Sequence, residues 1–203
     1  MSTIKTDNIV NRTGDQDSGL DLGTNDTIKL KIANSTKWTL NSSGNLFPSS
    51  TSQGICFGVT SDTASNRLED YEEGTWTPVV SSGMTSPTYS SQNGKYTKIG
   101  NIVRAYATCS TNGGTPNSNT WKIGGLPFTT RNDSSYTTAT MYVNSAGGNA
   151  KDTLLISFPN TTTAWLYEQT ETGVSQVVGT TIGTGPNSTI QLYFTLIYEA
   201  EGG

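Results

Sequence analysis

Apolar and polar residues alternate with a period of two near the N-terminus, which is typical of β-strands with one apolar face. The apolar positions of this stretch are Ile28, Leu30, Ile32, Trp38 and Leu40. The intervening residues 33–36 predict one turn, and Asn-Ser-Ser-Gly-Asn at 41–45 predicts another. A lone hairpin is marginal in water, so this one must dock on the rest of the chain or on copies of itself.

From Thr75 onward, strand signals recur about every ten residues. The last predicted strand is apolar on both faces. One face carries apolar residues at every second position from Ile190 to Tyr198, and the other carries Tyr193 and Ile197. Such a strand lies at the centre of a sandwich or packs against a neighbouring chain. The pattern predicts an all-β fold, with a β-sandwich of jelly-roll type as the head over 69–203. Its strands are expected at 76–80, 95–98, 102–109, 121–123, 137–143, 154–158, 164–167, 176–182 and 189–198.

The remaining segments are polar. Residues 1–47 form an N-terminal segment of extended chain and hairpin, in which the part before the hairpin has too few apolar anchors to fold alone. Residues 48–68 are rich in Pro, Ser, Thr and Gly and are predicted to be a linker. A helix is expected only over 61–73, with a Ser or Thr of its first turn as N-cap and Gly74 as its end.

Composition and charge exclude several classes of protein. Gly, Ser, Thr and Asn make up close to half of the 203 residues, yet aromatic and β-branched residues recur too often for a disordered chain. Lys and Arg are scattered without a basic run, so we expect no nucleic-acid binding. No apolar run approaches the roughly 18 residues of a membrane helix. The N-terminus also lacks an apolar segment of signal-peptide length, so we expect synthesis in the cytoplasm, no export signal and no membrane insertion.

Candidate metal and catalytic groups are few. The chain has no histidine, which removes His-based acid–base catalysis and the commonest transition-metal ligand. Cys56 and Cys109 are interpreted as two ordinary thiols. The segment 15–19 with Asp26 partly matches a calcium loop, but its Gly comes one position early and its last ligand is Asp, so a polar turn is preferred. We therefore expect no metal and no cofactor.

The chain has 16 acidic residues, and four of them, Glu69, Asp70, Glu72 and Glu73, fall within five positions. In a helix, each pair three or four apart would cost roughly 0.2–0.5 kcal/mol, which Arg67 would partly offset. A glycosidase needs two carboxylates that face each other across a cleft, about 5–10 Å apart, and such pairs seldom come from one short run. We therefore expect no catalytic residue here. A solvated acidic turn that leads into the first strand of a domain is the simpler interpretation.

The same residues carry a resemblance. NRLEDYEEGTWTP at 66–78 closely resembles a signature of bacteriophage fibre proteins, many from cyanophages and marine phages, where it opens the C-terminal domain. Residues 130–188 resemble these proteins only in composition. Matching pieces elsewhere are GKYTKIGNIV at 94–103, GGLPF at 124–128, the shaft-like KWTLNSSGNLFP at 37–48, and MSTIKTDNI at the start.

The resemblance implies a tail fibre or fibre-like virion structural protein. It would be a homotrimer, attached to other virion proteins by its N-terminal part and ending in a host-facing head. Threefold repetition could bury a one-sided hairpin. The acidic cluster would then mark the joint between shaft and head, where basic groups of neighbouring chains could meet it. The expected joint residues are Arg67, Glu69, Asp70, Glu72 and Glu73.

Receptor binding by such fibres usually involves a glycan or another surface polymer. Exposed aromatic side chains stack on sugar rings, and polar side chains supply hydrogen bonds. Trp76, in the first predicted strand of the head, is assigned to the core and is not among the candidate contacts. The loops 111–119 and 144–151 could form a binding rim. The candidate glycan contacts are Trp121, Tyr136, Tyr142, Trp165 and Tyr167, although each is individually typical of a core position.

Three alternatives stay open. A head or tail decoration or adaptor protein would bind other virion proteins and no receptor, which the shortness of the hairpin segment favours. A depolymerase tailspike is disfavoured because the chain lacks a long repeated β-helix and paired acids within the head. A free carbohydrate-binding module would fold as a monomer from residue 69 onward.

Overall fold

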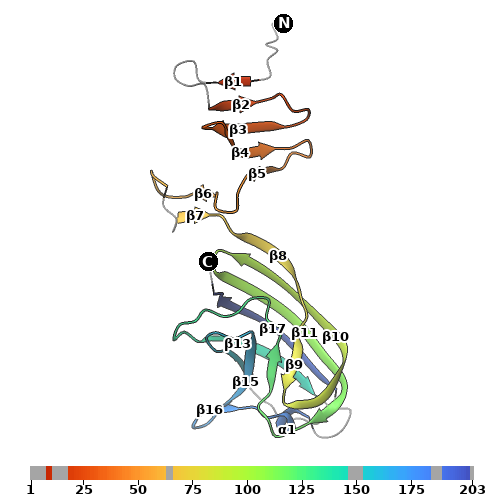
Figure 1. Cartoon of the computed structure of the whole chain (residues 1–203). Coiled ribbons are helices and arrows are strands. Elements are labelled where there is room, and N and C mark those ends of the chain that lie inside the picture. Colours follow the sequence, from red (N-terminus) through yellow and green to blue (C-terminus); the bar gives the residue numbers. More distant parts are fainter. Residues whose placement is uncertain (1–7, 11–17, 63–65, 146–152, 184–188, 202–203) are drawn as a thin grey trace. The chain divides into compact units, whose positions relative to one another are not determined.

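The computed structural model describes residues 8–10, 18–62, 66–145, 153–183 and 189–201 (Figure 1). The chain divides into two compact units, Met1–Asp70 and Tyr71–Gly203, here called the N-terminal and C-terminal units. Both are nearly all β, as the alternation predicts.

The N-terminal unit contains a five-stranded antiparallel sheet whose strands are paired in chain order, as Figure 1 shows. Two short strands then form a separate antiparallel pair. The sequence predicted only the central hairpin, because the flanking strands are too short to show a period. The strands of the sheet are β1 (Asn8–Val10), β2 (Gly19–Asp21), β3 (Ile28–Ile32), β4 (Ser35–Leu40) and β5 (Leu46–Pro48), and those of the pair are β6 (Ile55–Cys56) and β7 (Arg67–Leu68).

The turns of this sheet follow from local chemistry. Ala33 and Asn34 both have positive φ, 50° and 57°, as a two-residue hairpin turn with the twist of the flanking strands requires. In the next turn, the Asn41 side-chain oxygen accepts hydrogen bonds from the backbone N–H groups of Ser43 and Asn45, at 3.1 and 2.9 Å. Both predicted turns of the hairpin are therefore confirmed.

The five-stranded sheet is apolar on one face only. Leu30 pairs with Leu20 on one side and Trp38 on the other. The opposite face is mostly polar, with Asp21, Lys29 and Thr39 in one row. None of the described residues of this unit is buried. We call the following residues the shaft face: Ile9, Leu20, Ile28, Leu30, Ile32, Trp38, Leu40 and Leu46.

The C-terminal unit is a curled antiparallel sheet. Ten strands of the described residues belong to it, in the order β8-β10-β11-β17-β13-β14-β15-β12-β9, with β16 beside β15. β13 lets the sheet curl, because its first half pairs with β14 and its second half with β17. The strands are β8 (Tyr71–Trp76), β9 (Val79–Ser82), β10 (Met84–Ile99), β11 (Ile102–Pro116), β12 (Lys122–Gly124), β13 (Thr137–Ser145), β14 (Thr153–Ser157), β15 (Thr163–Thr170), β16 (Gly173–Gln176) and β17 (Ile190–Glu199).

The inward faces of this curled sheet enclose one apolar core. β17 alternates as predicted, with Leu192 and Leu196 buried and Ile197 exposed. Trp76 is also in the core, as expected, and its indole N–H donates to the Tyr106 carbonyl at 3.1 Å. Gly94 lies under this indole, where a Cβ atom would come within 2.5 Å of the ring nitrogen. A side chain at this position would therefore displace Trp76.

Three local expectations are wrong. The segment 61–73 is not a helix where it is described, because β7 and the start of β8 lie within it and β8 pairs with β10. Residues 111–116 continue β11 and do not form a loop, whereas 146–152 lie outside the described residues. The strand expected at 176–182 is mostly absent, since α1 occupies Gly179–Ile182. No helix among the described residues is long and apolar enough to cross a membrane.

The core of the C-terminal unit yields a stability prediction. Leu192→Ala, at a position 1% exposed in the central strand β17, should lower the free energy of unfolding by about 2–5 kcal/mol through lost burial and a cavity. Val174→Ala, at a position 57% exposed on β16, should change it by less than about 0.5 kcal/mol. Urea unfolding followed by tryptophan fluorescence measures both, and equal effects would contradict the assignment of the core.

Candidate functional site

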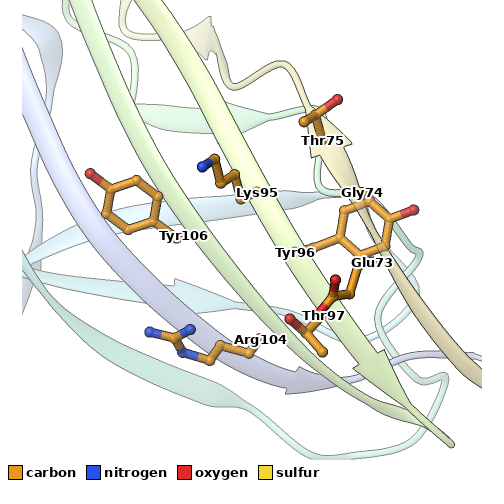
Figure 2. A pocket seen from close by; sticks show the side chains of 8 residues that line it. All are labelled: Glu73, Gly74, Thr75, Lys95, Tyr96, Thr97, Arg104 and Tyr106. Atoms are coloured by element: carbon orange, nitrogen blue, oxygen red, sulfur yellow. The ribbon is translucent and has the colours of Figure 1, made fainter.

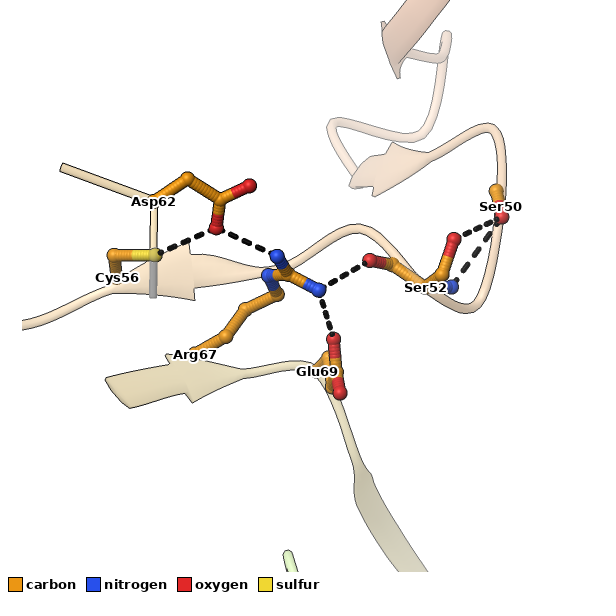
Figure 3. Close-up of polar contacts among 6 residues, drawn as sticks. All are labelled: Ser50, Ser52, Cys56, Asp62, Arg67 and Glu69. Atoms are coloured by element: carbon orange, nitrogen blue, oxygen red, sulfur yellow. Dashed lines mark hydrogen bonds and ion pairs between the residues drawn. The ribbon is translucent and has the colours of Figure 1, made fainter. Parts of the chain in front are cut away.

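Arg67 organises the end of the N-terminal unit (Figure 3). Its guanidinium donates to a carboxylate oxygen of Asp62 at 2.6 Å, to one of Glu69 at 3.0 Å, and to the Ser52 carbonyl at 3.0 Å. The hydrogen bond and charge of Arg67 lower the pKa of Asp62. One cation thus holds together three points of a segment that has little apolar packing of its own.

Two further carboxylates of the cluster, Glu72 and Glu73, bind tyrosines of the C-terminal unit. The Tyr96 hydroxyl donates a short hydrogen bond to Glu72, and the Tyr71 hydroxyl donates to Glu73 at 2.5 Å. These bonds raise the pKa of both tyrosines. Alternation along β8 places Glu72 and Glu73 on opposite faces of the strand, so they do not form a carboxylate pair.

The division between the two units falls after Asp70, inside the acidic run. The cluster is therefore shared between units. Its role as a joint between copies of the chain stays a prediction, and the structure supplies intrachain partners for Glu69, Glu72 and Glu73.

The described residues contain no cluster of His, Cys, Asp or Glu that could hold a metal ion. In the calcium candidate, 15–17 lie outside the described residues. The nearby Asp21 carboxylate accepts from the Gly23 N–H at 3.0 Å and lies 3.6 Å from the Lys31 ammonium. That neighbouring acid is therefore engaged in turn and sheet contacts.

The outward side of β8, β10, β11, β17 and the second half of β13 carries large apolar side chains. Ile99 pairs with Tyr71 on one neighbouring strand and with Ile102 on the other. Tyr193 pairs with Tyr142, and their ring centroids are 5.9 Å apart. We call this surface the isoleucine face. Its apolar members are Tyr71, Ile99, Ile102, Tyr106, Tyr142, Tyr193 and Ile197.

Charged groups lie among these apolar residues. Figure 2 shows an open hollow of about 460 Å³ lined by Lys95, Tyr106, Arg104 and Glu73, among others. Lys95 lies opposite Tyr106, and Arg104 lies opposite Ile197 on β17. Within the part of the chain that the structure describes, neither Lys95 nor Arg104 forms an ion pair. The hollow therefore offers charge of both signs beside apolar surface.

A second surface lies on the outward side of β14 and β15. The rings of Tyr136, Phe158 and Trp165 form a chain, with centroid distances of 5.3 and 4.7 Å. The Lys122 ammonium lies 3.8 Å from the Trp165 ring centre, and Tyr167 lies two residues along the same face of β15. We call these five residues the aromatic row. Sequence reasoning missed Phe158 and Lys122, because only the pairing of strands brings them beside Trp165.

A small polar pocket of about 120 Å³ lies on the opposite side of the strands from this row, because Thr137 and Ser157, which line it, alternate with Tyr136 and Phe158. Ser135 and Ser157, two of its lining residues, directly neighbour Tyr136 and Phe158. Arg131, another lining residue, forms ion pairs with Glu199 at 2.6 Å and Asp133 at 3.1 Å. One cation thus pairs with two carboxylates, which leaves a net negative charge, and the serine and threonine hydroxyls of the pocket add neutral hydrogen-bonding groups.

The structure separates the five candidate glycan contacts. Trp121 is fully buried, so its indole cannot stack on a ligand, and the expectation for this residue is wrong. Tyr142 lies on the isoleucine face. Tyr136, Trp165 and Tyr167 share the aromatic row, in which Tyr136 is the most open, at 62% exposed.

The Arg67 contacts predict an electrostatic shift. In Arg67→Gln, the pKa of Asp62 should rise toward the ordinary aspartate range, because its main hydrogen-bond and charge partner is gone. The lowered pKa in the parent means that this carboxylate stabilises the fold above its unfolded pKa and loses that contribution as pH falls through the folded pKa. NMR titration of the side-chain carboxyl measures both values. Asp21, which Arg67 does not contact, is the control, and an unchanged Asp62 pKa would contradict the pairing.

Comparison with known proteins assigns no role to these surfaces. No family model matches the chain, and no curated protein or solved structure is detectably similar to it. The position and chemistry of the shaft face, the isoleucine face and the aromatic row therefore bear directly on function.

Proposed function

We propose that the chain is a non-enzymatic structural protein of a phage virion, a homotrimeric tail fibre or fibre-like protein whose head attaches to glycans of the host surface. The N-terminal unit would join it to other virion proteins, and the C-terminal unit would form a jelly-roll-like head. The observation that carries the proposal is the shaft face, an apolar sheet surface in a unit with no buried described residue.

The shaft face requires a partner on energetic grounds. Ile28, Leu30 and Ile32 are 41%, 42% and 58% exposed, and each would contribute about 1.5–3 kcal/mol if fully buried from an exposed state. Ordering the backbone costs about 1–2 kcal/mol per residue, which a single uncovered layer cannot offset. Copies arranged about an axis would supply the missing layer. The resemblance of 37–48 and 66–78 to fibre proteins favours three copies.

The aromatic row supports the adhesive part of the proposal. Tyr136 presents an open ring, and Lys122 and the Tyr167 hydroxyl add polar groups to the same outward surface. Aromatic rings contact the C–H faces of sugars, and such polar groups bind their hydroxyls. A neutral polysaccharide fits this combination, because the row offers rings and hydroxyl groups and its one cation, Lys122, already lies over the Trp165 ring.

The proposal predicts a trimer in solution. Light scattering on the full chain should give a mass near three times 21.6 kDa. Leu30→Glu should reduce it to the mass of one chain, because it places a charge in the shaft face. Thr39→Glu adds the same charge to the opposite face of the same sheet, beside Lys29, and should leave the mass unchanged. A monomeric parent chain would overturn the fibre proposal and favour a single-chain binding or decoration module.

A second prediction separates adhesion from a purely structural role. The labelled full chain should bind at least one member of an array of purified bacterial surface polysaccharides, and Tyr136→Ala should abolish that binding. Val174→Ala, an equally exposed position on β16, should retain it. A trimer that binds none of the array would favour the decoration or adaptor alternative. Release of reducing sugar would instead favour a depolymerase.

A further inference from the structure

The isoleucine face is unusual for the outward side of a solvated sheet, where polar residues normally alternate with buried ones. Ile99, Ile102 and Ile197 are 51%, 56% and 55% exposed, and they adjoin one another across β10, β11 and β17. Ile197 lies on β17, a central strand of the sheet, whereas Ile99 and Ile102 flank the turn between β10 and β11. The outward side of this part of the sheet therefore carries an apolar patch among polar residues such as Thr97, Thr108 and Thr195.

The area of this face approaches that of a specific interface. Each tyrosine has about 150–250 Å² to bury, so the partly exposed tyrosines and isoleucines together leave on the order of 600 Å² uncovered per copy. A standard protein–protein interface buries about 800 Å² per partner. The face is therefore slightly smaller than a self-sufficient interface, and it would associate weakly if the unit were free in solution.

The charges on the face favour a second copy of the same surface as the occupant. Glu73 lies on β8, and Lys95 and Arg104 lie on β10 and β11, so the face carries both signs of charge a short distance apart. Around a threefold axis each copy meets its neighbour through different parts of this face, so the acid of one copy can approach the bases of the next. A membrane or a polyanion would leave Glu73 opposed to like charge.

Attachment to associated N-terminal units would strengthen the weak contact between C-terminal units. If N-terminal units associate, as the proposed function requires, the C-terminal units are held at an effective concentration in the millimolar range for short linkers. Tyr71, the first residue of the C-terminal unit, lies on the isoleucine face itself. The face therefore begins at the boundary between the two units, 25 positions after Leu46, the last residue of the shaft face.

From these observations we propose that the isoleucine face is the surface through which the C-terminal units of neighbouring copies contact one another, which leaves the aromatic row free to bind ligand. Ile102 and Ile197 form the apolar centre of the contact, and Glu73 pairs across it with Arg104 or Lys95. The inference rests on the proposed self-association. It adds that the head contributes its own contact surface, separate from the shaft face.

Site-specific photo-crosslinking in the full chain tests the assignment. Ile197→p-benzoylphenylalanine places a photoreactive ketone on the isoleucine face, and irradiation should convert much of the protein to covalent dimers and trimers on a denaturing gel. Val174→p-benzoylphenylalanine, with similar exposure on β16, should leave it at the mass of one chain. A trimer by light scattering that gives no interchain product from position 197, or equal product from both positions, overturns the inference and leaves the fibre proposal intact. A monomer in light scattering overturns both.

A charge-swap experiment tests the electrostatic part in the same molecule. Arg104→Glu in the position-197 background should reduce the interchain product, and adding Glu73→Arg should restore it, because opposite charges again face each other. Thr39→Glu in the shaft is the matched control for added negative charge and should leave the product unchanged. Failure of Glu73→Arg to restore the product would overturn the proposed pairing across the contact.

Discussion

A sheet with apolar residues on one face needs a second apolar layer, and the two units of this chain meet that need differently. In the C-terminal unit the sheet curls, so its inward residues cover each other and Trp76, Leu166 and Leu196 are buried. In the N-terminal unit five short strands form a single-layer sheet in which no described residue is buried, and Leu30 stays 42% exposed. The rest of the proposed biology depends on how that second layer is supplied.

The C-terminal unit has the same problem in milder form on its outward side. Its two outer surfaces differ in chemistry. The isoleucine face combines aliphatic side chains with the cations Lys95 and Arg104, which suits contact with protein. The aromatic row has a lysine over an indole and an open tyrosine, which suits a hydroxyl-rich ligand. A head built in this way would keep its assembly surface and its binding surface on different strands.

The acidic run shows how strand geometry disperses charge. In a helix these carboxylates would crowd each other at three- and four-residue spacing. In a strand, Glu72 and Glu73 point to opposite faces and each accepts a tyrosine hydroxyl, while Glu69 pairs with Arg67. The run thus joins a region stabilised by ionic contacts to one stabilised by packing.

Period-two alternation by itself determined that the chain is all β, where most strands lie and that β17 is apolar on both sides, because that signal depends only on neighbouring residues. Even the turn at Ala33 and Asn34 follows from local chemistry. Tertiary structure alone decided that Trp121 is buried, that Phe158 and Lys122 flank Trp165, and that Ile102 and Ile197 form one surface. These placements depend on which strands pair and in what register, and pairing between residues far apart in sequence leaves no mark in the local pattern.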